Sequence, residues 1–175
     1  MTHLTTEQLQ KNLTKISTLS DSQGELKLIV ARLPEEQRLV LNKAKLTAEN
    51  GVPGDRWNLA EPKNPEAQIT IMNYDVAEMI AIENERIPEF GDNLYVEASV
   101  GVEEFPVGTK FKIGSATLEI TSKAHTGCHK FARRFGHEAL KFVNSKETAE
   151  YRLRGVYAKV IEDGVVEVGN TLEKI

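Results

Sequence analysis

The sequence predicts a mainly β fold, a barrel or sandwich of short strands with short helices beside it. Short stretches that alternate between apolar and polar side chains recur along the chain, with turn-forming residues between them. Two pairs of these stretches are joined by two-residue turns that contain glycine, which is typical of β-hairpins. The chain has 175 residues, of which 40% are hydrophobic, so a single domain with its own core is expected.

The first 23 residues are expected to form a helical extension of a barrel domain that comprises residues 24–175. Apolar residues recur at helical spacing from Leu4 to about Leu19. Thr5 is expected to cap this helix, with Gln8 three residues later completing a capping box. The sequence shows no chemistry on this helix, which is expected to cover the barrel or a partner.

Beyond this extension the pattern changes to the two-residue period of strands. Strands are expected at residues 25–30, 39–46, 68–72, 94–96, 111–113, 116–120, 156–161 and 165–168. Gly114-Ser115 and Asp163-Gly164 are the expected turns of two hairpins that join the last four strands in pairs. Asn73 is expected to cap a short helix, and residues 128–143 predict a second helix, interrupted at Gly136.

Composition excludes several classes of protein. The net charge of −4 argues against a nucleic-acid-binding protein. The sequence contains no run of about 18 apolar residues, so no membrane span is expected. The N-terminus lacks the basic and apolar regions of a signal peptide. A cytoplasmic location is therefore expected, and a single cysteine, which cannot form an intramolecular disulfide, fits that reducing compartment.

That cysteine, Cys128, lies in the most basic part of the chain. Residues 120–137 contain no Asp or Glu. They contain Lys123, Lys130, Arg133 and Arg134 and three of the four histidines, His125, His129 and His137. Cys128 also follows Thr126-Gly127 at the expected start of a helix, where free N–H groups favour an anion. Both features predict a thiol with a lowered pKa, and therefore a reactive one.

Other interpretations of the same residues remain open from the sequence. Cys128 could belong to an apolar helix face with Phe131 and Phe135, at spacing i, i+3 and i+7. His125, Cys128 and His129 could bind a metal ion, although structural zinc sites usually have four ligands with several cysteines. The basic side chains could form a solvated face.

The chain resembles the MOSC family, which comprises the C-terminal domain of molybdenum-cofactor sulfurases and its stand-alone bacterial relatives. The motifs that carry the resemblance, in order, are Gly51-Val52-Pro53-Gly54-Asp55-Arg56-Trp57, Phe90-Gly91-Asp92-Asn93-Leu94, Pro106-Val107-Gly108-Thr109, the His125-Thr126-Gly127-Cys128 segment, Arg154-Gly155-Val156-Tyr157-Ala158 and Gly164-Val165-Val166-Glu167-Val168-Gly169. The form of the cysteine segment indicates the stand-alone bacterial type. Asp92 stands where the family usually has Glu, and Asn170 where it has Asp.

The resemblance implies a MOSC-type β-barrel that binds a molybdenum cofactor of the molybdopterin type or carries sulfur as a persulfide. Cys128 would then be the molybdenum ligand or the sulfur carrier, with His125 or His129 as a proton donor or a residue that orients the sulfur. The residues expected to bind the cofactor are Lys130, Arg133, Arg134, Arg154, Asp55 and Arg56. Some family members reduce N-hydroxylated bases with redox partners.

The expected partners are a cysteine desulfurase or a redox protein, because the chain contains no pyridoxal-phosphate domain. A homodimer is a further option, and neither nucleic acid nor a membrane is expected as a partner. The alternative from another class is a non-catalytic barrel that binds an anionic ligand. A thiol redox protein is less favoured, since no second cysteine can resolve an intermediate within the chain.

Overall fold

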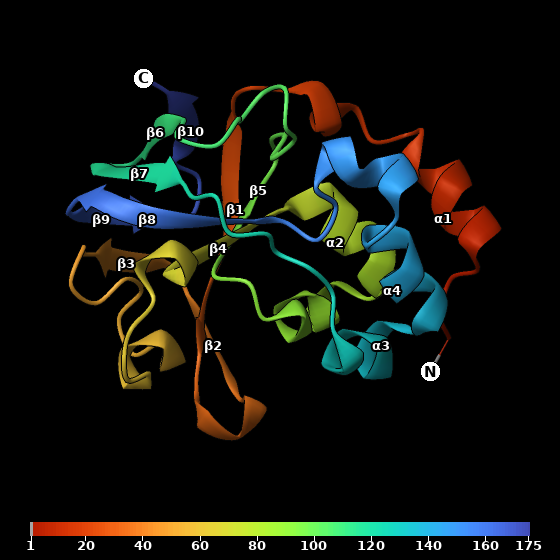
Figure 1. Ribbon diagram of the computed structural model, residues 1–175, viewed down its shortest axis with the longest axis horizontal. Coiled ribbons are helices and arrows are strands. Elements are labelled where there is room, and N and C mark those ends of the chain that lie inside the picture. Colours follow the sequence, from red (N-terminus) through yellow and green to blue (C-terminus); the bar gives the residue numbers. More distant parts are fainter. Residues whose placement is uncertain (1) are drawn as a thin grey trace.

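The computed structural model describes residues 2–175, within which seven strands form a closed barrel (Figure 1). The barrel strands are β1 (Gly24–Arg32), β4 (Ile69–Asn73), β5 (Leu94–Val96), β6 (Lys110–Ile113), β7 (Ala116–Ile120), β8 (Val156–Glu162) and β10 (Thr171–Lys174). Their order is β10-β6-β7-β8-β4-β5-β1, and β1 closes the ring by pairing with β10. Among these pairs, β4–β5 is parallel and the others are antiparallel. The prediction of a mainly β fold with short helices is confirmed.

The strand expected at residues 39–46 is two strands with different partners. β2 (Arg38–Leu41) pairs with the outer part of β1, whereas β3 (Lys43–Leu46) pairs with β9 (Gly164–Glu167) in a separate two-stranded sheet. The change of partner occurs at Asn42, whose carbonyl accepts a hydrogen bond from Val168 N–H. The continuous alternation of the sequence conceals this break, because both strands keep the same period.

One of the two expected hairpins forms and the other does not. β6 and β7 pair up to the Gly114-Ser115 turn, where Gly114 has a φ of +58°. β8, in contrast, lies between β7 and β4, and β9 crosses to β3. The prediction of a β8–β9 hairpin was wrong, because β9 pairs with β3 instead. Gly164, at the start of β9, packs against the backbone of Ser115, where a Cβ would lie 2.2 Å from the carbonyl carbon.

Four α-helices in residues 2–175 gather on one side of the barrel (Figure 1). They are α1 (Thr6–Leu13), α2 (Tyr74–Ala81), α3 (His129–Phe135) and α4 (His137–Val143), and the 3₁₀ helices are Ser17–Ser20, Pro34–Glu36, Arg56–Leu59, Pro65–Ala67, Asn84–Phe90 and Lys146–Tyr151. None of the helices in residues 2–175 is both long and apolar enough to cross a membrane.

Caps define the ends of the first two α-helices. The capping box of Thr5 and Gln8 is present, but α1 ends at Leu13 rather than near Leu19. The Thr14 hydroxyl donates to the Lys11 carbonyl at the helix end, a local bond that competes with helix continuation. Asn73 caps α2 as expected, with its side chain accepting from Val76 N–H.

Successive residues of the barrel strands serve two apolar cores. Ile29 and Ile71 face the barrel interior, whereas Val30 and Met72, one position later, pack against the helices. All four side chains are at most 1% exposed. Because the helices cover one wall of the barrel, strands in that wall are apolar on both faces. One of these helices, α3, begins where the segment that follows β7 ends.

Candidate functional site

Cys128 is the residue at which the segment after β7 becomes helix. It is the N-cap of α3, with extended backbone, and its side chain is exposed. The helix break at Gly136 occurs as predicted, with a φ of +93° between α3 and α4. Phe131 and Phe135 are buried, so the interpretation in which Cys128 shares their apolar face was wrong.

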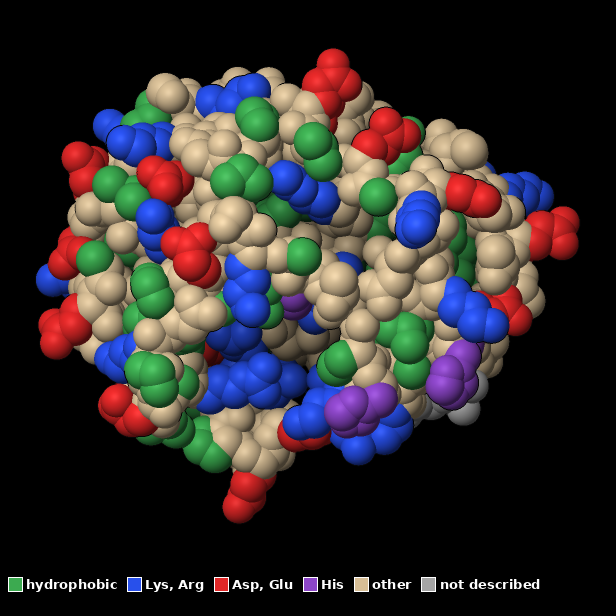
Figure 2. Space-filling model, viewed as in Figure 1, with side chains coloured by type: hydrophobic (Ala, Val, Ile, Leu, Met, Phe, Trp, Pro, Cys, Tyr) green, Lys and Arg blue, Asp and Glu red, His purple; other side chains and the backbone are tan. Residues whose placement is uncertain are grey.

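A cavity of about 250 Å³ opens beside Cys128. Its lining residues are Arg32, Arg38, Arg56, Phe90, Gly91, His125, Thr126, Cys128, Lys130, Phe131, Arg134, Arg154 and Tyr157. Figure 2 shows Lys and Arg side chains gathered around a hollow on this face, with a histidine visible inside it. We refer to this cavity as the Cys128 pocket. Six of its lining side chains are cationic and none is a carboxylate.

Two of the pocket cations have no carboxylate partner among residues 2–175. Arg38 donates to the backbone carbonyls of Pro88 and Gln37, and Arg56 makes no ion pair in the same range. Burial lowers the pKa of both guanidinium groups, and neighbouring cations lower it further. The pocket therefore carries positive charge that the described protein does not neutralise, which favours an anionic ligand.

A buried ion pair holds the back of the pocket. Asp55 accepts three hydrogen bonds from Arg32: from its backbone N–H at 2.7 Å, from Nε at 2.9 Å and from Nη2 at 2.7 Å. Asn93 Nδ2 donates to the same carboxylate at 3.0 Å. Burial opposes ionisation, but the bonds and charge of Arg32 hold the pKa of Asp55 below its usual range. Asp55 is 1% exposed and does not line the pocket; it positions Arg32, which does.

A second buried network connects His125 to Arg154. Asp92, which is fully buried, lies 2.8 Å from His125 Nε2 and 2.5 Å from Arg154 Nη1. Burial opposes ionisation of Asp92, but the charge of Arg154 and the contacts with His125 keep its pKa well below the usual value. Burial and the Arg154 charge lower the pKa of His125. A neutral His125 must donate Nε2–H to the ionised Asp92, which leaves Nδ1 as an acceptor.

The Cys128 thiol has a pKa below that of an ordinary cysteine. Partial burial alone would raise this pKa, but the backbone N–H groups of Phe131 and Lys130 and the charges of Arg154 and Lys130 outweigh it. The direction of this shift favours the thiolate, as the basic segment predicts.

A third cluster lies at the mouth of the pocket. Glu36, from the turn between β1 and β2, contacts Lys130, Arg133 and Arg134 at 2.9, 2.7 and 2.6 Å. Hydrogen bonds from Lys130 and Arg134 lower the pKa of Glu36 to about 2. Lys130 and Arg134 also line the pocket, whereas Arg133 is 64% exposed and does not.

The structure brings together six of the nine predicted site residues and leaves three outside. The six that line the pocket are Cys128, His125, Lys130, Arg134, Arg154 and Arg56. His129 is exposed and Arg133 lies at the mouth, while Asp55 is buried behind Arg32. No group of three or more His, Cys, Asp or Glu side chains in residues 2–175 is arranged to hold a metal ion, so the geometry does not support a site of His125, Cys128 and His129 alone.

Sequence reasoning missed Arg32, Arg38 and Tyr157. Arg32 and Arg38 form the last residue pair between β1 and β2, far from Cys128 in sequence. One signal for Arg32 was available, namely a charged residue directly after the apolar run of a strand. The Tyr157 ring lies 4.5 Å from the His125 ring, centroid to centroid, and forms the wall beneath it.

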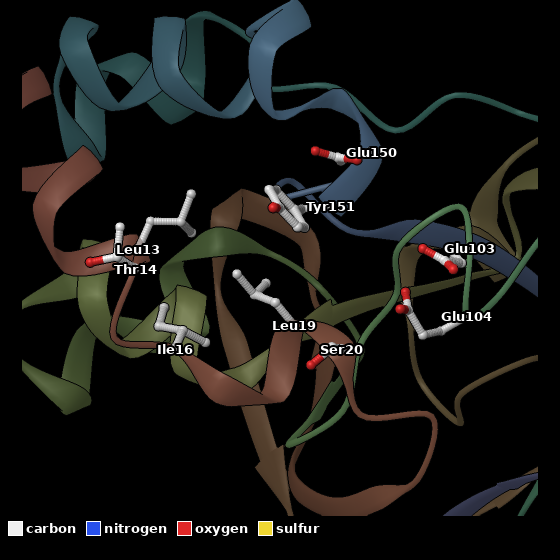
Figure 3. A pocket seen from close by; sticks show the side chains of 9 residues that line it. All are labelled: Leu13, Thr14, Ile16, Leu19, Ser20, Glu103, Glu104, Glu150 and Tyr151. Atoms are coloured by element: carbon white, nitrogen blue, oxygen red, sulfur yellow. The ribbon is translucent and has the colours of Figure 1, made fainter.

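A larger cavity, of about 400 Å³, lies elsewhere, between the N-terminal segment, the loop that contains Glu103 and Glu104, and the 3₁₀ helix Lys146–Tyr151 (Figure 3). Figure 3 shows Leu13, Ile16 and Leu19 on one side of it and the carboxylates of Glu103 and Glu104 on the other. It contains no cysteine, histidine or cation. We therefore place the candidate site at Cys128 despite the smaller volume there.

Together, the fold and the site define a helix-flanked β-barrel with one exposed cysteine at a cation-lined pocket. A family profile described as MOSC domain matches residues 63–173, more than half of the sequence. The chain therefore belongs to the MOSC family, which is associated with the molybdenum cofactor and with sulfur-related functions.

Solved structures share the same fold. A protein titled only as hypothetical has a TM-score of 0.65 at 20% identity, over 88% of this chain and 69% of that one. YiiM from Escherichia coli has a TM-score of 0.58 at 20% identity, over 86% and 69% of the two chains. A YUAD protein from Bacillus subtilis has a TM-score of 0.58 at 17% identity, over 86% and 94%. No curated protein matches the sequence.

Proposed function

We propose that this protein binds a molybdenum cofactor of the molybdopterin type and that the Cys128 thiolate is the molybdenum ligand. The observation that carries this proposal is the combination of an exposed thiol, whose pKa is lowered, with a cavity lined by six cationic side chains and no carboxylate. Membership of the MOSC family supports it.

The donor set of the pocket fits such a cofactor better than it fits a bare metal ion. A soft thiolate suits a transition metal, but one protein ligand cannot hold a free ion, and residues 2–175 contain no cluster of further ligands around Cys128. The remaining ligands would come from the dithiolene of the cofactor. An anionic ligand would neutralise the unpaired charges of Arg38 and Arg56. Neutralisation of this kind would offset the repulsion between these two cations.

Each pocket residue has a role that follows from its position. Arg38 and Arg56 bind the anionic groups of the cofactor. Arg154, which is held by Asp92, adds positive charge near the sulfur. His125, with Nε2–H donated to Asp92, is neutral and accepts a hydrogen bond at Nδ1, so it orients a group or receives a proton rather than supplying one. When bound, the cofactor supplies two-electron redox chemistry, such as reduction of an N-oxygenated substrate with electrons from a separate protein.

Sulfur transfer is the second candidate, and the exposure of Cys128 favours it. A persulfide carrier must present its sulfur to a partner as large as a cysteine desulfurase, and the thiol lies at the surface. The cationic cavity has no evident use in that function, because a persulfide is small. We therefore rank cofactor binding first.

Metal analysis separates the two candidates. The full chain, expressed with molybdate, is expected to retain close to one molybdenum and one pterin per protein, and Cys128→Ser to lose at least about nine-tenths of the metal. Equal molybdenum content in both proteins, or none in either, contradicts the first proposal. Cyanide-labile sulfur on the wild-type protein after treatment with a cysteine desulfurase, without molybdenum, would support the second.

A further inference from the structure

Glu36 brings one carboxylate to three basic side chains of a single helix. Lys130, Arg133 and Arg134 follow each other at i, i+3 and i+4 on α3, and all three contact it at 2.9 Å or less. No other carboxylate in residues 2–175 pairs with these three side chains. The cluster thus has three positive charges around one negative charge. Convergent guanidinium and ammonium donors of this kind are typical of phosphate-binding sites.

The carboxylate reaches this cluster from an exposed turn rather than from the pocket wall. Glu36 ends the short helical turn Pro34–Glu36 between β1 and β2, and each residue from 34 to 37 is exposed. Glu35 and Glu36 have φ values of +57° and +60°, in the left-handed region that residues other than glycine rarely adopt. Withdrawal of Glu36 would leave both apolar cores unchanged, because neither contains a residue of the turn.

The cluster is continuous with the Cys128 pocket. Lys130 and Arg134 contact Glu36 and also line the pocket, so a ligand that extends outward from Cys128 meets them next. The two oxygens of a carboxylate resemble two oxygens of a phosphate group in spacing and acceptor geometry. A phosphate dianion would neutralise the cluster better than the single charge of Glu36 does.

We propose that Lys130, Arg133 and Arg134 form a subsite for the phosphate of a phosphate ester, and that Glu36 occupies this subsite when no ester is bound. The inference rests on the proposed function, since the ester is the outer end of the ligand whose inner end meets Cys128. Glu36 is then a competitor that the ligand must displace. Its removal increases affinity for any phosphate at this position.

Titration calorimetry of the full chain with inorganic phosphate tests the competition. Glu36→Gln keeps the size of the side chain and removes its charge, and it is expected to bind phosphate at least about tenfold more tightly than the wild-type protein. Glu35→Gln is the matched control. It removes the same charge from the adjacent residue, whose carboxylate makes no ion pair among residues 2–175, and its phosphate affinity is expected to stay within about twofold of wild type.

Equal affinities of Glu36→Gln and Glu35→Gln, or no binding by either, would overturn the proposal. Arg133→Ala in the Glu36→Gln background locates the anion, because Arg133 reaches the subsite without lining the pocket. Unchanged phosphate affinity in that double variant would also overturn it. The gain in Glu36→Gln is expected to persist in a Cys128→Ser background, so the phosphate result stands or fails independently of molybdenum binding.

Discussion

At the scale of the residue, the lowered pKa of Cys128 depends in part on Lys130, two residues further along the same helix. The Lys130 side chain adds positive charge close to the sulfur, and its backbone N–H faces the thiolate. Lys130→Met is expected to remove up to about 1 kcal/mol of this stabilisation, because the pair is partly exposed. Alkylation of Cys128 by iodoacetamide at pH 7 should then slow by roughly two- to fivefold.

Lys141→Met provides the control for that measurement. Lys141 is an exposed residue of α4, and its replacement changes the net charge of the protein equally. An unchanged alkylation rate in Lys130→Met, or an equal decrease in both variants, would show that local charge does not set the thiol pKa.

Asp92 is expected to contribute stability that depends on pH. Its pKa in the folded protein is lowered, so between that pKa and the unfolded value of about 3.9 the unfolded chain binds more protons. The contribution is therefore complete above about pH 4 and is lost as pH falls through the folded pKa. Asp92→Asn leaves Arg154 buried without a counter-charge, which typically costs about 3–5 kcal/mol.

Denaturant unfolding of wild type and Asp92→Asn from pH 7 down to pH 3 measures this effect. The difference in the free energy of unfolding should be largest at neutral pH and should shrink below about pH 4. Asp21→Asn, at an exposed position, is expected to change the free energy of unfolding by no more than about 0.5 kcal/mol at any pH. A difference that does not vary with pH would contradict the assignment of an ionised Asp92.

At the scale of the element, Gly155 determines how closely β8 approaches β4. Its φ is +97°, and a Cβ would lie 2.3 Å from the carbonyl oxygen of Ile71. Gly169 has almost the same φ, +96°, but a Cβ there would meet nothing within 4 Å. Comparison of Gly155→Ala with Gly169→Ala therefore separates the close contact from the backbone strain.

Both alanine variants are expected to lose about 1–2 kcal/mol to the left-handed backbone. Gly155→Ala should lose a further 1–3 kcal/mol, about the cost of overpacking, because the clash is with backbone and not with a flexible side chain. Thermal or denaturant unfolding of the two variants measures the difference. Equal losses would mean that the β4–β8 spacing can adjust.

Local signals in the sequence predicted some elements and could not predict others. The Gly114-Ser115 turn predicts its hairpin because the pairing depends on adjacent residues only. Asp163-Gly164 is an equally good turn sequence, yet the strands on either side pair elsewhere. The pairing that replaces the hairpin, β3 with β9, joins residues far apart in the sequence.

Some residues of the candidate site could likewise be predicted from local sequence, and others could not. Cys128 and its basic neighbours stand together in one acid-free segment, so sequence inspection finds them. Arg32 and Arg38 reach the pocket only because β1 and β2 pair and the barrel closes. His129 and Arg133 carry suitable chemistry, but neither side chain lines the cavity.

At the scale of the whole molecule, the N-terminal helix is part of the core that covers the barrel. Leu9 is fully buried, in an apolar core that also contains Ala139 and Phe142 of α4. Leu9→Ala is expected to lower the free energy of unfolding by about 2–5 kcal/mol. Leu59→Ala, at a position 69% exposed, should change it by less than about 0.5 kcal/mol.

Denaturant titration of both leucine variants gives the comparison. A small effect of Leu9→Ala would support the expectation that residues 1–23 are a separable extension. A large effect would mean that the extension and the barrel unfold together.

The joint between β1 and β10 has a consequence for how the molecule is made. Gly24 pairs with Leu172 and Glu25 with Thr171, so the ring closes through residues almost 150 positions apart. This pairing can form only after β10 has been synthesised. Contacts between such distant positions are slow to form, and an open ring exposes strand edges that can bind other chains. The protein is therefore most exposed to association with other chains in the interval before β1 and β10 pair.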